Sequence, residues 1–197
     1  MSAAASRLAV LWAAAALLLS GCWIGDNFYQ LSESRHVLPA GDYRLRGDSA
    51  GMLDSGAVRV SHLPDGTTRL VPISENGTTD EGDAFALGLA ALGGSEALAV
   101  AWVTAMEEQA TNPDMRLYGV LRRNADGSHS LLFPTCEGEG LTAARAAGAE
   151  VVGGPDRPGC RFPSRAALEA ALRAMAPQLD SGFRLTPLLP PAGGSAS

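Results

Sequence analysis

The chain has 197 residues, of which 46% are hydrophobic and 18% charged, a composition that fits one globular domain and excludes wholesale disorder. All 15 basic residues are arginines, so lysine Schiff-base chemistry and the lysine of a phosphate-binding loop are excluded. The net charge of −6 argues against nucleic acid as a partner, because nucleic-acid binding needs a basic face.

The N-terminal residues have the features of a secretory signal. Arg7 is followed by an uninterrupted apolar run, Leu8 to Leu19. As a helix this run would measure about 18 Å, well short of the roughly 30 Å hydrocarbon core of a bilayer. We therefore predict a signal peptide over residues 1–21 rather than a membrane-spanning helix.

The apolar run ends in Leu19-Ser20-Gly21-Cys22, which resembles the lipobox of bacterial lipoproteins. The resemblance implies cleavage before Cys22, a thioether-linked lipid on its sulfur and acylation of the new amine, which makes the membrane a partner. In that family an Asp after the cysteine commonly favours the inner membrane, and Trp23 stands there instead. We expect a periplasm-facing position on the outer membrane, with the inner membrane as the alternative. The other interpretation is an ordinary secretory signal with a chance cysteine.

Two cysteines remain, Cys136 and Cys160. Because the lipid occupies Cys22 and the compartment is oxidising, we predict a disulfide between them. The alternatives are two buried thiols or a nucleophilic cysteine. Neither cysteine has the spacing of a metal site, and we expect no metal and no cofactor.

Residues 22–40 show no clean hydrophobic period, and we predict a lipid anchor followed by a tether. From residue 41 the pattern changes to short alternating runs, which are typical of strands. Three Gly-containing turns join these runs into hairpins. The seven candidate strands cover residues 42–46, 57–62, 67–73, 84–92, 97–104, 116–123 and 128–133.

After Cys136 the pattern becomes helical. Thr142 is a candidate cap for a short Ala-rich turn that ends at Gly148, and Ser164 for a helix that ends at Ala176. We expect residues 183–188 to form a last strand and residues 190–197 a disordered tail. The predicted helix carries one apolar stripe, formed by Ala167, Leu168, Ala171, Leu172 and Met175.

Strands without intervening helices favour an antiparallel sheet. We therefore predict a single α+β, mainly β periplasmic domain over residues 41–189. Its fold is an antiparallel hairpin meander of about seven strands with a C-terminal helix packed on the sheet. Alanine has a low strand propensity, so residues 84–104 form either two strands or a helical hairpin.

One pair of motifs suggests hydrolase chemistry. Gly47-Asp48-Ser49-Ala50-Gly51 satisfies G-x-S-x-G, and Asp126-Gly127-Ser128-His129 resembles the D-x-x-H block of the GDSL (SGNH) hydrolases. The resemblance implies Ser49 as nucleophile and His129 as its base. A nucleophile elbow, however, needs a buried strand before it and a helix after it, and Ser49 has neither. We interpret the first motif as a turn.

The other polar residues are interpreted as surface groups. His36, His62 and His129 show no ligand spacing, and the acidic loops do not match an EF-hand. Those loops contain Asp80, Glu81, Asp83, Glu107, Glu108 and Asp114. Gly41-Asp42-Tyr43 stands where the bacterial lipocalins carry Gly-x-Trp, a resemblance limited to this block and to a meander followed by a helix.

These observations predict a lipid-anchored envelope protein with a non-enzymatic structural or interaction role and an unknown envelope protein as partner. The alternatives are a lipocalin-like binder of small ligands and a serine hydrolase centred on Ser49.

Replacement of Cys22 tests the lipid anchor. A Cys22→Ser precursor should remain uncleaved by the lipoprotein signal peptidase and should incorporate no labelled palmitate in bacterial cells, because the thioether cannot form. Cys160→Ser serves as the control and should be labelled like the native protein. Normal labelling of the Cys22→Ser variant would contradict the assignment.

Overall fold

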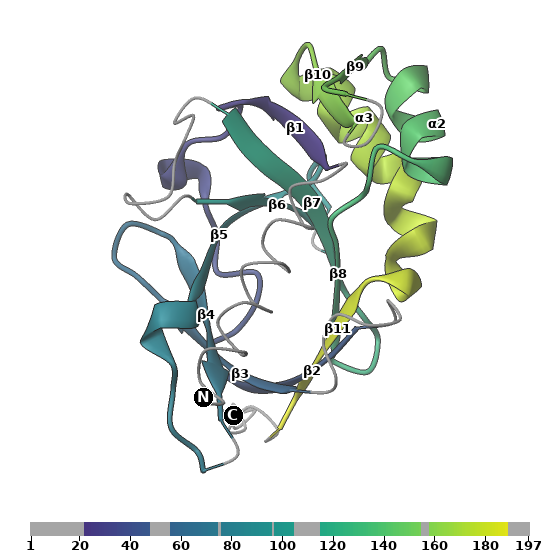
Figure 1. The fold of residues 1–197 in the computed structure, drawn as a ribbon. Coiled ribbons are helices and arrows are strands. Elements are labelled where there is room, and N and C mark those ends of the chain that lie inside the picture. The colour runs from purple at the N-terminus through teal and green to yellow at the C-terminus, as the bar shows by residue number, and fades with distance from the viewer. Residues whose placement is uncertain are drawn as a thin grey trace, which may run out of the picture.

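The computed structural model describes residues 22–47, 56–74, 76–95, 97–104, 115–154 and 158–188, and within them eight antiparallel strands close into a barrel (Figure 1). From β2 to β8 each strand pairs with the next along the chain, and β11 lies between β8 and β2. The barrel strands are β2 (Gly41–Gly47), β3 (Gly56–His62), β4 (Thr68–Ile73), β5 (Phe85–Ala91), β6 (Leu98–Val103), β7 (Met115–Arg123), β8 (His129–Leu132) and β11 (Phe183–Pro187).

The mainly β prediction is confirmed, and all seven predicted strands occur within the described residues. Residues 84–104 contain two strands and not a helical hairpin, because β5 pairs with β6 along its length. A Cβ on Gly88 of β5 would lie 2.0 Å from Trp102, its cross-strand partner, so the indole packs directly over bare backbone. The predicted last strand is present as β11, and its pairing with β2 and β8 closes the meander into a barrel, which the sequence did not predict.

Residues 22–40 belong to the folded domain, so the predicted tether is wrong. β1 (Trp23–Asp26) pairs antiparallel with β7 and parallel with β10 (Gly159–Phe162), which also pairs with β9 (Glu150–Val152). Trp23 is fully buried and packs edge-on against Phe162. The segment lacks a period because it passes from this strand through a short 3-10 turn, η1 (Leu31–Glu33), to the end of the barrel.

The second half of this segment, residues 34–40, covers one end of the barrel, and we call it the strap. The Ser34 hydroxyl donates to the Gly66 carbonyl at 2.7 Å and accepts from the Leu89 N–H at 3.1 Å. Leu38 is 1% exposed and packs among the side chains of the barrel interior. The covered end, where β2 begins and β7 ends, is the barrel mouth.

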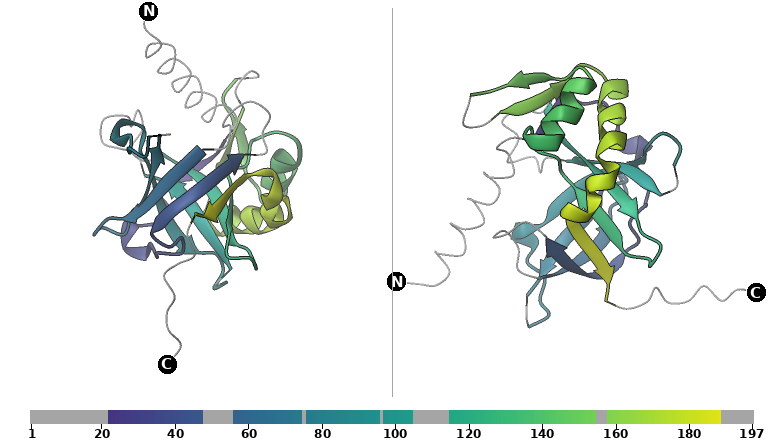
Figure 2. Two further views of the ribbon diagram at one scale, coloured as in Figure 1. Left: turned by 90° about the horizontal axis from the view of Figure 1, so that it is seen from below. Right: turned by 90° about the vertical axis from the view of Figure 1, so that its right-hand side faces the viewer.

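Two α-helices of the described residues, α2 (Gly138–Ala146) and α3 (Arg165–Met175), lie along one side of the barrel (Figure 2). Ser164 caps α3 as predicted, because its hydroxyl accepts from the Ala167 N–H at 3.2 Å. Thr142 does not cap a helix; it lies inside α2, which starts earlier than expected, and donates to the Gly138 carbonyl. Two further 3-10 turns, η2 (Glu81–Asp83) and η3 (Ala176–Ser181), precede β5 and β11.

Apolar side chains form two cores, one inside the barrel and one between its wall and the helices. The predicted stripe on α3 lies in the second core with Val100, Trp102 and Val120, which confirms that the C-terminal helix packs on the sheet. The barrel interior is filled by Leu38, Tyr43, Val58, Val60, Leu70, Leu87, Leu89, Ala99, Ala101, Leu121, Leu131 and Leu185.

The predicted disulfide between Cys136 and Cys160 is present, with a Cα–Cα distance of 5.3 Å. It ties the segment before α2 to β10, directly beside β1. Residues 1–21 and 190–197, the predicted signal peptide and tail, lie outside the described residues. No helix in the described part of the chain combines the length and the apolar character needed to cross a membrane.

Removal of the disulfide should weaken the helical side of the molecule before the barrel. We expect a Cys136→Ser/Cys160→Ser double variant to lose about 2–4 kcal/mol of unfolding free energy in urea, because the bridge restricts the unfolded chain. Amide exchange should rise first in α2 and β10. The native protein, analysed without reduction, should be lighter than its reduced form by two hydrogen atoms. Equal urea stability of the two proteins would rule out this role for the bridge.

Candidate functional site

A recess of about 320 Å³ opens at the barrel mouth. The strap forms one wall, and β2, β11 and the β7–β8 hairpin form the others. Among the described residues, its lining contains an arginine and aromatic rings but no Asp or Glu. The lining residues are His36, Val37, Pro39, Tyr43, Arg123, Gly127, His129 and Pro187.

Strand register brings the central residues of the recess together. Arg123 is the last residue of β7 and His129 the first of β8, and the two are cross-strand partners. Cross-strand partners project from the same face of a sheet, with Cα atoms about 4.5–5.5 Å apart. β11 places Leu185 opposite His129 and Pro187 opposite Tyr43. The recess is therefore built from segments far apart in the sequence.

His129 is the unusual group at the mouth. It is 2% exposed, and neither of its ring nitrogens has a hydrogen-bond partner within the described residues. Burial lowers the pKa of His129 and the charge of Arg123 lowers it further, while the backbone of Val37 opposes the shift without reaching hydrogen-bond geometry. The imidazole is therefore neutral at neutral pH, with one donor and one acceptor to offer. Leaving such a group unpaired costs about 1–3 kcal/mol.

All three histidines gather at the mouth. His36 stacks on His62 with ring centroids 3.8 Å apart, and the His62 Nε2 donates to the Leu38 carbonyl at 2.9 Å. The interpretation of His129 as an exposed residue is wrong. The signal that would have corrected it is strand phase, because His129 shares a face with Leu131, which points into the barrel interior.

Arg123 carries a charge that no described neighbour balances. Its guanidinium forms no hydrogen bond or ion pair within the described residues. Asp126, in the adjacent turn, accepts from the Ser128 hydroxyl at 2.6 Å and pairs with Arg184. The Ser128 hydrogen bonds, followed by Arg184, lower the pKa of Asp126 to about 2, so this carboxylate is already engaged.

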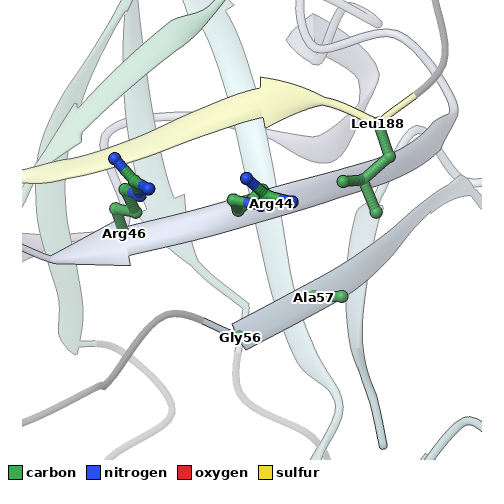
Figure 3. A pocket seen from close by; sticks show the side chains of 5 residues that line it. All are labelled: Arg44, Arg46, Gly56, Ala57 and Leu188. Atoms are coloured by element: carbon green, nitrogen blue, oxygen red, sulfur yellow. The ribbon is translucent and has the colours of Figure 1, made fainter. Parts of the chain in front are cut away.

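A second hollow, of about 360 Å³, lies on the outer wall of the barrel (Figure 3). It is lined by Arg44 and Arg46 of β2, Gly56 and Ala57 of β3, and Leu188. None of these residues is buried, so their polar groups are hydrated without a ligand. The mouth recess is the better candidate because it contains a buried polar group, His129, that has no hydrogen-bond partner in the described part of the chain.

The predicted lipidation residue, Cys22, lies one residue before β1. Its backbone forms an isolated bridge with Thr135, and its carbonyl accepts from the Cys160 N–H at 3.2 Å. The thiol is buried, and burial raises its pKa to about 11. Cys22 is thus fixed against the disulfide-bonded side of the domain.

The hydrolase motif is only partly visible. Ser49 lies outside the described residues, which stop at Gly47 and resume at Gly56.

In the acidic loops, Asp80 accepts from the Gly82 N–H and Glu81 pairs with Arg69, while Glu107, Glu108 and Asp114 lie outside the described residues. No group of three potential metal ligands occurs in the part of the chain that the structure describes.

A comparison of this chain with protein-family models, curated proteins and solved structures finds no match. The function is therefore argued from the geometry of the mouth recess.

Two histidine variants separate a site residue from a structural one. We expect His129→Leu to raise the free energy of unfolding by about 1 kcal/mol, because it removes an unpaired buried polar group. The gain should grow as the pH falls below the ordinary histidine value of 6.5, since the unfolded chain then binds a proton that folded His129 resists. His62→Leu is the matched control and should lose about 0.5–1.5 kcal/mol with its bond to Leu38. Urea unfolding at several pH values measures both, and a destabilised His129→Leu protein would show that His129 is a structural residue.

Proposed function

We propose that this chain is a lipid-anchored, non-enzymatic envelope protein whose barrel binds a small molecule reversibly at its mouth. The observation that carries the proposal is His129, a buried imidazole in the wall of a recess of about 320 Å³, whose two ring nitrogens have no partner among the described residues. Small-molecule sites in proteins typically measure about 300–1,000 Å³ and combine apolar walls with a few polar groups. The recess lies at the lower end of this range, which favours a small ligand.

The packing of the barrel supports a site at the mouth rather than a deep one. Every barrel strand except β6 contributes at least one large side chain to the buried interior, and Leu38 of the strap packs on top of them. A ligand would therefore rest above this layer, between the strap and the β7–β8 hairpin. A lipocalin-like binder with a deep internal cavity is less compatible with this filled interior.

Two observations support an envelope location. The lipobox resemblance at Cys22 favours a membrane anchor, and the Cys136–Cys160 disulfide suits an oxidising compartment such as the periplasm. We place the protein on the outer membrane, facing the periplasm. Because β1 starts at Trp23, the lipid would join the domain without a tether. Acyl chains do not fit the buried position of the Cys22 thiol, so lipidation requires this side chain to turn outward.

Ligand-observed ¹⁹F NMR with small fluorinated aromatic probes tests binding at the mouth. The lipidated full chain in nanodiscs should broaden the signal of at least one of 4-fluorobenzoate, 4-fluorobenzyl alcohol and 4-fluorobenzylamine. Pro39→Trp should remove the broadening, because Pro39 is exposed and lines the recess, which the new ring would fill.

Leu188→Trp is the matched control, since Leu188 is also exposed but lines the hollow on the outer wall. This variant should broaden the probe signals like the native protein. Loss of broadening in Leu188→Trp alone would move the binding to the outer wall, and no broadening by the native protein would overturn the proposal.

A further inference from the structure

The charges around the mouth recess differ from those of the whole chain. The chain carries a net charge of −6, yet the described residues that line the recess include Arg123 and two histidines and no acidic residue. Asp126 in the neighbouring turn is held by Ser128 and Arg184. Within the described residues, the recess therefore presents a cation without a counter-charge.

Arg123 and His129 are placed to act on the same group of a ligand. They are cross-strand partners, and both side chains line the recess. A guanidinium offers a planar fork of N–H donors that matches a carboxylate or a phosphate, and a neutral imidazole adds one more N–H. The Tyr43 hydroxyl already donates its proton to the Pro39 carbonyl at 2.9 Å. The N–H groups that the recess can offer to a ligand are therefore those of Arg123 and His129.

We propose that the ligand at the mouth carries an oxyanion, either a carboxylate or a phosphate ester, that Arg123 and His129 bind together, and that its binding is coupled to the uptake of a proton by His129. This inference rests on the proposed function and specifies its ligand. The ligand must also be small, because the recess measures about 320 Å³ above a filled interior.

The coupling follows from what surrounds His129. It is opposed by Arg123 from β7 and Leu185 from β11, approached edge-on by the Tyr43 ring from β2, and shares the recess with His36 from the strap. None of these groups is negative, and both burial and Arg123 hold the pKa of His129 below its ordinary value. A bound oxyanion would add a negative charge beside the ring and so favour its protonated form. By linkage, the affinity for the oxyanion must rise as the pH falls through the range where bound His129 takes up the proton.

Four probes that share one fluorinated ring test the ligand class by ¹⁹F NMR titration of the full chain in nanodiscs. They are 4-fluorobenzoate, 4-fluorophenyl phosphate, 4-fluorobenzyl alcohol and 4-fluorobenzylamine. We expect at least one anionic probe to bind about tenfold more tightly than the alcohol and the amine. A tenfold gain in affinity is what one charge-assisted hydrogen bond typically contributes. The carboxylate and phosphate arms show which oxyanion the recess prefers.

Paired variants assign the effect to the recess. Arg123→Gln should weaken the anionic probes about tenfold and leave the alcohol unchanged. Arg44→Gln is the matched control, because Arg44 is an exposed arginine of the outer wall that also lacks a described partner, and it should change nothing.

The proton coupling is measured with the carboxylate probe, because a phosphate ester titrates in the same range. Its affinity should rise as the pH is lowered from about one unit above to about one unit below the ordinary histidine value of 6.5. His129→Gln should abolish most of this rise, and His36→Gln should keep it. A rise of equal size in His129→Gln would overturn the coupling.

The outcomes distinguish this inference from the proposed function. If the alcohol or the amine binds as tightly as both anions, and Pro39→Trp removes that binding, the ligand class is wrong and the mouth site stands. If no probe binds the native protein, the proposed function fails and this inference with it. If Arg44→Gln weakens the anions and Arg123→Gln does not, the anion site lies on the outer wall, which overturns the inference.

Discussion

The pairing of β11 with both β2 and β8 is the constraint on which the rest of the structure depends. This strand returns from the C-terminal side of α3 and inserts between the first and the last strand of the meander. It thereby turns an open sheet with two unpaired edges into a closed barrel. Leu185, at its centre, is fully buried between Leu45 and His129. Closure on eight strands leaves a narrow interior, which explains why β6 contributes only Ala99 and Ala101 to its fully buried part.

Closure also creates an end that must be covered, and the N-terminal segment covers it. Ser34 bonds to the β3–β4 turn and to β5, and Leu38 seals the interior below the strap. The cover is partial, because the strap leaves a recess between itself and the β7–β8 hairpin. The candidate site thus exists only where the first described segment, the middle hairpin and the last strand meet. Such a site depends on the complete fold and not on any one motif.

This origin explains how far the sequence could predict the molecule. The strands from β2 to β8 and the helix after Ser164 follow from local alternation, turn residues and a capping hydroxyl, all of which act over a few residues. The disulfide followed from the compartment and an even pair of cysteines. The strap and β1 were missed because their partners, such as Phe162 for Trp23, lie far along the chain. The alternation of β8 could have predicted that His129 points into the barrel. Its pairing with Arg123 and its lack of a described hydrogen-bond partner depend on the strand register, which the sequence does not show.

Two unfavourable features of the mouth, the unpartnered imidazole of His129 and the unbalanced charge of Arg123, are adjacent, and this adjacency favours one binding site for both. Among the described residues, the His129 imidazole has no hydrogen-bond partner beside Leu131 and Leu185, so a leucine there would stabilise the protein more. Arg123 has no counter-charge within the same residues, and its charge further disfavours the protonated imidazole. Exceptions to consistent packing of this kind are expected at functional sites. The strand register places Arg123 opposite His129, so both groups line the same recess. A single bound oxyanion would accept a hydrogen bond from the imidazole and balance the charge of the guanidinium. The arginines of the outer wall are exposed, as Arg123 is, but none of the described residues that line their hollow is a buried polar group without a partner, so a ligand there would relieve no comparable cost.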